Sequence, residues 1–279
     1  MAGTSLVEKA ERLRKLHVPG RPLVLPNAWD AGSAKIIAAE GFPAVATTSA
    51  GIAFAYGVPD GEAISRGDML HATRRIAAAV AVPVTADVEA GYGPEPQNVA
   101  YTVMELLGAG VVGANFEDSS DAHDGGRLFD LALATARIAA GRKAAEAAGV
   151  PFVINGRTDA LMRIKEPEKA FAEAVKRLSA YRKAGADCLF APFTADPGTI
   201  GRLVKAVDGP LNIILQPTIT VPEMAKLGVA RISLGGHVAR AALAVARRAA
   251  RELKEHGTAN FAKEGLDYRE LQKLMASRP

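Results

Sequence analysis

Thr85-Ala-Asp-Val-Glu-Ala-Gly-Tyr-Gly93 is the stretch that decides the fold, because it reads as a buried strand that ends in two acids and then breaks into a glycine loop. Residues two apart on a strand point to the same face, so Asp87 and Glu89 would repel each other without a cation between them. A third acid, Glu117, ends the next apolar run. Mg²⁺ needs only one or two protein carboxylates, so we predict a metal site built from these three acids. The alternative for each acid alone is a helix cap or a salt bridge.

The same strand and helix unit repeats on both sides of this stretch. Short apolar runs are typical of buried strands, and longer segments rich in Ala, Arg and Glu are typical of amphipathic helices. Eight strands are predicted at residues 23–29, 44–50, 84–90, 113–118, 152–159, 188–193, 211–217 and 231–236. Eight helices alternate with them, at residues 31–40, 66–80, 96–108, 129–148, 167–184, 197–207, 221–227 and 238–255.

Eight such units without a linker or a change of composition predict an α/β fold, a closed (β/α)8 barrel that forms one domain over residues 1–279. An open doubly wound sheet is the alternative, but no G-x-G-x-x-G follows the first strand. A helix near residues 5–17 and a helical tail near residues 259–276 flank the barrel. Glycines that follow the predicted helices fit as helix stops, at Gly41, Gly110, Gly149, Gly185 and Gly228.

Composition excludes several classes of protein. Hydrophobic residues make up 49% of the 279, ample for a core, yet no apolar run is long and clean enough to span a bilayer. The N-terminus lacks the apolar centre of a signal peptide, and Cys188 is the only cysteine, so we expect a reducing cytoplasm. The net charge of +4 is spread along helices and aromatic residues are 5%, which argues against nucleic acid and suits a small anionic substrate.

In such barrels the active site lies at the C-terminal ends of the strands. There Ser49 and Gly51, with the neighbouring Thr48, can offer a hydroxyl and backbone N–H groups to a carboxylate. Arg157 can hold a second carboxylate bidentately, unless it pairs with the nearby acids. Trp29 and Gln216 also stand at the ends of predicted strands. Trp29 would form a wall of the pocket or pack in the core, and Gln216 would lie beside the substrate.

The long polar loop after Glu117 could close over a ligand, and it contains His123. A lone loop histidine is more often in solvent, but it is one candidate for proton transfer. Cys188 starts the sixth predicted strand, where we expect a buried and unreactive thiol. His237 begins a helix after two glycines, where N–H groups could meet an anion.

Taken together, these residues resemble the isocitrate lyase/phosphoenolpyruvate mutase superfamily. The resemblance covers nearly the whole barrel and rests on six motifs: Asn27-Ala-Trp-Asp-Ala-Gly-Ser-Ala34, Thr48-Ser-Ala-Gly-Ile-Ala53, Gly57-Val-Pro-Asp60, Asp87-Val-Glu-Ala-Gly-Tyr-Gly93, Asn115-Phe-Glu-Asp118 and Asn155-Gly-Arg-Thr-Asp-Ala-Leu161. It implies Mg²⁺, with Mn²⁺ as a substitute, and a dimer or tetramer that often exchanges the eighth helix between subunits. It also implies that Asp60, Asp87, Glu89 and Glu117 surround the metal and that Arg157 binds substrate.

The sequence departs from the family pattern in the loop after the fourth strand. Superfamily lyases that cleave isocitrate or methylisocitrate carry Lys-Lys/Arg-Cys-Gly-His there, and this chain has Ser119-Ser-Asp-Ala-His-Asp-Gly-Gly126. The cysteine that serves as general acid is absent, as are the lysine and asparagine of the phosphonate-forming mutases. Glu89 also stands where better-known members have Asp. The resemblance therefore predicts the fold and the metal more firmly than it predicts the reaction.

The expected function is a Mg²⁺-dependent carbon–carbon lyase or decarboxylase that acts on a small 2-oxo or 2-hydroxy dicarboxylate through an enolate. A proton would come from a metal-bound water, Asp60 or His123. The alternatives are an isomerase of the phosphoenolpyruvate or carboxyphosphonoenolpyruvate mutase type and a non-catalytic 2-oxo-acid binder.

Overall fold

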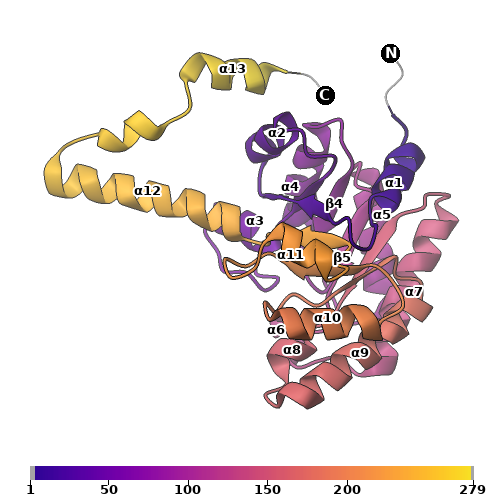
Figure 1. Ribbon diagram of the computed structural model, residues 1–279. Coiled ribbons are helices and arrows are strands. Elements are labelled where there is room, and N and C mark those ends of the chain that lie inside the picture. Colours follow the sequence, from indigo (N-terminus) through magenta and orange to yellow (C-terminus); the bar gives the residue numbers. More distant parts are fainter. Residues whose placement is uncertain (1–3, 278–279) are drawn as a thin grey trace.

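The structure, a computed structural model, describes residues 4–277 and shows a barrel of parallel strands surrounded by helices (Figure 1). The nine strands follow the order β1-β9-β8-β7-β6-β5-β4-β3-β2 in the sheet. They are β1 (Leu23–Leu25), β2 (Asn27–Ala28), β3 (Val45–Thr47), β4 (Val84–Asp87), β5 (Gly113–Phe116), β6 (Val153–Arg157), β7 (Cys188–Phe190), β8 (Leu211–Ile214) and β9 (Arg231–Ser233).

The barrel closes through its first predicted strand, which is split in two at Pro26. Proline has no N–H to donate to a ladder, so the hydrogen-bonded strand breaks there. The part before the break, β1, pairs with β9, and the part after it, β2, pairs with β3. The predicted (β/α)8 barrel is therefore confirmed, with the ninth strand arising from this single interruption.

The helices lie close to the predicted positions. They are α1 (Leu6–Lys15), α2 (Ala31–Ala39), α3 (Ser49–Ala55), α4 (Arg66–Ala78), α5 (Pro96–Gly108), α6 (Asp121–Asp124), α7 (Leu131–Ala147), α8 (Ala160–Arg163), α9 (Pro167–Lys183), α10 (Pro197–Ala206), α11 (Val221–Lys226), α12 (His237–His256), η1 (Asn260–Glu264) and α13 (Tyr268–Ala276). All five glycines predicted as helix stops have positive φ, a conformation that glycine adopts at no steric cost.

The strands are shorter than predicted at their C-terminal ends. The second predicted strand, 44–50, ends at Thr47, because Thr48 caps a helix that begins at Ser49. The third, 84–90, ends at Asp87. The short helices α3, α6 and α8 are absent from the prediction, since none is long enough to show a 3.6-residue period. Each of them follows a strand and therefore borders the C-terminal end of the barrel.

The core has two parts. The larger cluster fills the space between the strands and the surrounding helices. The smaller one lies at the N-terminal end of the strands, where α1 places Ala10 and Leu13 against Leu25 and Val153. The capping box of Ser5 and Glu8 fixes the start of α1. This end of the barrel is therefore plugged by α1.

The last long helix, α12, leaves the barrel instead of packing along it (Figure 1). Within α12, all of whose residues are described, only Ala239 is buried, while Leu243 and Leu253 are about half exposed. The chain then returns, and α13 contacts α2, where the ammonium of Lys35 donates to the carbonyls of Met275 and Ser277. No helix within residues 4–277 has the length and apolar character to cross a membrane.

Candidate active site

A pocket of about 300 Å³ lies at the C-terminal ends of the strands, where the sequence places the chemistry. Of the predicted site residues, Thr48, Ser49, Asp60, Asp87, Glu89, Glu117 and Arg157 line it. Acidic side chains outnumber basic ones along its wall: Asp60, Asp87, Glu89, Glu117, Asp121 and Asp159 face Arg157 and Arg163. The pocket therefore carries an excess of negative charge.

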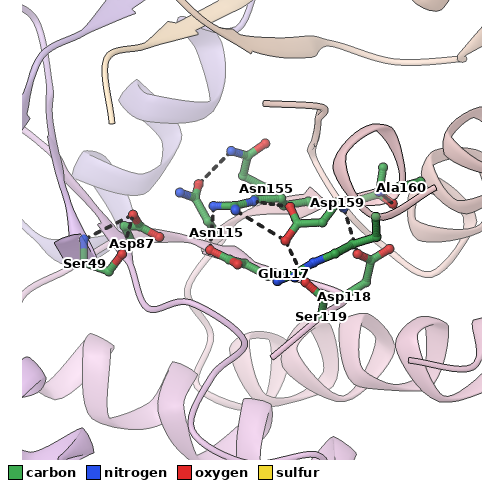
Figure 2. A network of polar contacts seen from close by, with 12 residues as sticks. Ser49, Asp87, Asn115, Glu117, Asp118, Ser119, Asn155, Asp159 and Ala160 are labelled. Atoms are coloured by element: carbon green, nitrogen blue, oxygen red, sulfur yellow. Dashed lines mark hydrogen bonds and ion pairs between the residues drawn. The ribbon is translucent and has the colours of Figure 1, made fainter. Parts of the chain in front are cut away.

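Asp87 ends β4 and is buried. Its Oδ2 accepts hydrogen bonds from the backbone N–H and the hydroxyl of Ser49, at 3.2 and 3.1 Å (Figure 2). Its Oδ1 is buried and has no hydrogen-bond partner within residues 4–277. A buried carboxylate oxygen without a donor is costly, so this atom marks a place where a ligand or ion can bind.

Glu89 lies in the loop after β4, not on the strand as predicted. Its φ of 53° is left-handed, so the argument that Asp87 and Glu89 share a strand face is wrong, although both line the pocket. The backbone N–H of Glu62 donates to Glu89 Oε2 at 2.6 Å. Burial, together with the charges of Asp60 and Asp87, raises the pKa of Glu89 to about 8. This side chain is an acid crowded by other acids.

Glu117 follows β5, and Arg157 ends β6. Arg157 Nη1 lies 2.5 Å from Glu117 Oε1, and its Nε donates to Asp159 Oδ1 at 2.8 Å. Burial raises the pKa of Glu117 well above its ordinary value, although Arg157 opposes that shift. Burial alone would lower the pKa of Arg157, but Asp159 and Glu117 outweigh it and raise the pKa. Arg157 is therefore both a pocket residue and the partner of two acids.

The neighbouring acid Asp118 has a different role. It is 2% exposed and accepts from the hydroxyl of Tyr181 at 2.6 Å and from the guanidinium of Arg177 at 3.2 Å. It also accepts from the backbone N–H of Asp159 at 2.9 Å (Figure 2). Asp159 in turn accepts from the hydroxyl of Ser119 at 2.7 Å. Asp118 therefore has a structural role, because its contacts connect the loop after Glu117 and the end of β6 to helix α9.

The loop that carries His123 folds over the pocket rim and includes α6. His123 Nε2 lies 2.8 Å from Glu62 Oε2, so the histidine is held outside the pocket wall. Glu62 also accepts from the backbone N–H of Tyr92 through Oε1. Asp60 is two residues from Glu62 and lines the pocket. Burial against the wall and the charge of Asp87 raise the pKa of Asp60, although part of this residue is exposed.

Three predicted binding residues lie elsewhere. Trp29 packs against the core. The backbone N–H of Gly51 donates to the hydroxyl of Thr48, which caps α3. A Cβ added at Gly51 would lie 2.9 Å from Cβ of Trp29. Gly51 therefore allows close packing, and it is not among the residues that line the pocket. Gln216 lines a separate hollow with His237 beside the start of α12.

Sequence reasoning missed Glu62 and Arg163. Glu62 follows Asp60 in the same loop, and its positive φ of 59° is unusual for a residue with a side chain. Arg163 ends α8 and lines the pocket. Neither residue stands at a predicted strand end, so the rule that located the other acids could not find them.

The pocket residues fit a divalent cation. Asp87 Oδ1 is buried and has no partner among the described residues, and burial, together with the charges of Asp60 and Asp87, raises the pKa of Glu89. A cation would supply the missing charge and the missing partner. Among the described side chains, no three of His, Cys, Asp and Glu are grouped so that they could hold a metal ion by themselves. Mg²⁺ needs fewer protein ligands, because it takes one or two carboxylates and keeps waters or substrate oxygens.

Two relatives among known proteins cover most of the chain. A protein of Mycobacterium tuberculosis named only as uncharacterized is 37% identical over 86% of this chain and 88% of its own length. The 2,3-dimethylmalate lyase of Eubacterium barkeri is 32% identical over 72% of this chain and 68% of its own length.

Solved structures agree with these relatives. A Burkholderia cenocepacia J2315 protein, provisionally named a lyase/mutase, superposes with a TM-score of 0.89 at 38% identity and covers 98% of this chain and 97% of its own. A phosphonopyruvate hydrolase in complex with oxalate and Mg²⁺ superposes with a TM-score of 0.84 at 27% identity, over 95% of this chain and 94% of its own. The family model for phosphoenolpyruvate phosphomutase matches residues 13–254. The chain therefore belongs to the phosphoenolpyruvate phosphomutase family, within the isocitrate lyase/phosphoenolpyruvate mutase superfamily.

Proposed function

We propose that the protein is a Mg²⁺-dependent carbon–carbon lyase or decarboxylase that acts on a small 2-oxo or 2-hydroxy dicarboxylate through an enolate. The observation that carries the proposal is the unpartnered Oδ1 of Asp87 in a pocket where acids outnumber arginines. The phosphonopyruvate hydrolase structure, which contains Mg²⁺ and oxalate in the same fold, supports both the metal and a small carboxylate ligand.

The pocket side chains would have different roles in binding the metal and the substrate. Asp87, Glu89 and Glu117 would hold Mg²⁺, directly or through water, and Mn²⁺ could replace it. When bound, the ion supplies positive charge that stabilises negative charge developing on a substrate oxygen. Ser49 fixes the orientation of the Asp87 carboxylate through Oδ2, and Oδ1 is left without a partner among the described residues. Arg157 fixes Glu117 in the same way.

Asp60 is the residue proposed to transfer the proton. It lines the pocket, and its raised pKa means that it holds a proton at higher pH than an ordinary aspartate. The cysteine of the better-known lyases has no counterpart in the loop after Glu117. His123 contacts Glu62 and not the pocket, so we propose that it acts on the loop and not on the substrate.

A mutase reaction is the second candidate, because the matching family model describes phosphoenolpyruvate phosphomutase. A non-catalytic 2-oxo-acid binder is the third, because the loop lacks the usual general acid. The three differ in what happens to a bound substrate. A lyase breaks a carbon–carbon bond, a mutase moves a phosphoryl group between carbon and oxygen, and a binder leaves its ligand unchanged.

The deciding experiment is a substrate screen with Mg²⁺. Purified protein would be incubated with oxaloacetate, 2-methylisocitrate, 2,3-dimethylmalate and phosphonopyruvate, and products would be followed by NMR. We expect cleavage of one of the three phosphorus-free acids and no turnover when EDTA removes the metal. Rearrangement of phosphonopyruvate would favour the mutase, and binding without turnover would favour the binder. The Asp87→Asn variant serves as the inactive control.

We also propose that the protein is a homo-oligomer in which α12 packs on a second copy. The helix is detached from its own barrel and exposes Leu243, Val245 and Leu253. Beside its start, Pro217, Ile219 and other residues line an apolar hollow. Light scattering should give a dimer or larger assembly, and Leu253→Glu should shift it toward the monomer. A monomeric parent protein at micromolar concentration would contradict this proposal.

A further inference from the structure

The two arginines that line the pocket differ in how many N–H groups of the guanidinium already have a protein partner. Arg157 meets Glu117 through Nη1, and it meets Asp159 through Nε at 2.8 Å and through Nη2 at 3.4 Å. Both acids have little exposure, with side chains 12% and 1% exposed. A substrate carboxylate would have to displace one of these buried partners, which would leave a buried acid unpaired.

Arg163, in contrast, has an exposed carboxylate as its partner and one N–H that has no partner among the described residues. Its Nη2 lies 3.1 Å from Asp121 Oδ1, and the side chain of Asp121 is 65% exposed. Such an exposed pair contributes little, because solvent screens it and Asp121 loses almost nothing on release. Arg163 Nε is buried and has no hydrogen-bond partner among the described residues. A planar fork with an unused N–H suits a carboxylate.

The loop over the pocket holds this guanidinium in place. Gly126 has a φ of 75°, and a Cβ on it would lie 2.5 Å from Arg163 Nη1 and in collision with Asp121 Oδ1. The backbone of the loop therefore packs directly against the pair, as only glycine permits. Arg163 is thus positioned before a ligand arrives, which lowers the entropy that binding must overcome.

We propose that Arg163 is a specificity-determining residue that binds the second carboxylate of the substrate and releases Asp121 to solvent. The inference rests on the proposed function, since it requires that the first carboxylate or oxo group binds at the acid cluster around Asp87. It adds to that function the residue that recognises the second carboxylate of the 2-oxo or 2-hydroxy dicarboxylate. Met162 and Phe193, which also line the pocket, offer apolar contacts to that chain.

Calorimetry with Mg²⁺ tests the assignment through binding and needs no turnover. Oxalate is the probe for the metal end alone, and linear 2-hydroxy dicarboxylates of four to six carbons, starting with malate, are the probes that add a distal carboxylate. We expect Arg163→Gln to weaken the best dicarboxylate at least about tenfold, the loss of a hydrogen bond to a charged group, and to leave oxalate affinity within about twofold. Arg163→Lys should fall between, because it keeps the charge but not the fork.

Two further variants separate binding from a structural role. Asp121→Asn should bind the dicarboxylate as well as the parent or better, because a competing acid is gone. Arg202→Gln removes an ion-paired arginine outside the pocket and should change neither affinity. Equal losses for oxalate and dicarboxylate in Arg163→Gln, a matching loss in Asp121→Asn, or no dicarboxylate that binds better than oxalate would each overturn the inference. Failure of the parent to bind oxalate with Mg²⁺ would instead refute the proposed function.

Discussion

The two ends of the barrel both contain buried charge, but they treat it differently. At the N-terminal end, Asp187 accepts from the guanidinium groups of Arg14 and Arg142 and from the backbone N–H of Ile154. Arg142 also donates to the carbonyl of Gly185, so its charge is enclosed by partners. At the C-terminal end, one oxygen of Asp87 has no donor within residues 4–277, and acids outnumber arginines along the pocket.

We interpret this difference as one between carboxylates that stabilise the fold and carboxylates that are proposed to bind a ligand. A hollow of about 650 Å³ at the N-terminal end is larger than the acidic pocket. Its partly buried carboxylate, Asp187, is already paired with Arg14 and Arg142, although Nε2 of His17 in the same hollow is buried and has no partner among the described residues. The hollow beside the start of α12, of about 840 Å³, is larger still, so volume alone would not single out the acidic pocket. Incomplete pairing of a buried acid is the better indicator of function.

The strongest way to break this comparison is to remove Asp87. Asp87→Ala should weaken Mg²⁺-dependent ligand binding more than about 100-fold, or about 2.7 kcal/mol, since loss of an outer-shell partner alone costs 10- to 100-fold. Without metal and above about pH 8, where Glu89 is ionised, its thermal stability should equal or exceed that of the parent, because repulsion with Glu89 is relieved. Calorimetry and thermal melts measure the two effects. Unchanged Mg²⁺ affinity would remove Asp87 from the metal site.

At the other end, Asp187→Ala should have the opposite profile. Loss of this acid leaves Arg142 without its carboxylate, and we expect a loss of about 2–3 kcal/mol in the free energy of unfolding, below the range for fully buried pairs because Asp187 is 18% exposed. Ligand binding at 25 °C should stay near the parent value. Urea denaturation checks the stability. A stable Asp187→Ala protein with impaired ligand binding would mean that the N-terminal end takes part in function.

The pH dependence of the free energy of unfolding should show that Glu89 keeps its proton in the folded protein. The pKa of Glu89 is raised to about 8 in the folded protein, so the folded state holds a proton that the unfolded state releases near pH 4.5. That contribution is complete below about pH 4.5 and is lost as pH rises through about 8. Metal-free protein should lose about 2 kcal/mol between pH 6 and 8.

Glu89→Gln is the matched control for that experiment, because the amide keeps the shape and cannot ionise. Its melting temperature should change less over the same interval, and Mg²⁺ should flatten the profile of the parent. A parent profile that rises from pH 6 to 8 without metal would show that Glu89 is already ionised in the folded state.

The smallest expected effect comes from Cys188, which begins β7 directly after Asp187. It is fully buried, and burial raises the pKa of its thiol to about 12, as the sequence predicts. Cys188→Ala should retain activity within about twofold and lose about 1 kcal/mol of stability from the small void. Stoichiometric inactivation of the parent by a thiol reagent, with protection by substrate, would contradict this assignment.

Much of the molecule could be predicted from the sequence because the relevant signals are local. Strand and helix periodicities, with glycines such as Gly110 and Gly185 at helix ends, are set by residues a few positions apart and lead directly to the barrel. The rule that strand ends meet at one rim then brings Asp87 and Glu117 to the same pocket. Even where a strand ended early, as before Glu89, the acid still reached the pocket.

Tertiary structure alone decided which partners those acids have. Glu62 reaches Glu89 across 27 positions of the chain and Arg163 reaches Asp121 across 42, and no local pattern encodes which loops meet over the barrel. The same holds for α12, whose sequence predicts a helix but not that it leaves its own barrel. Periodicity specifies the element and the face that it buries, whereas pairing between loops depends on how all the units close together.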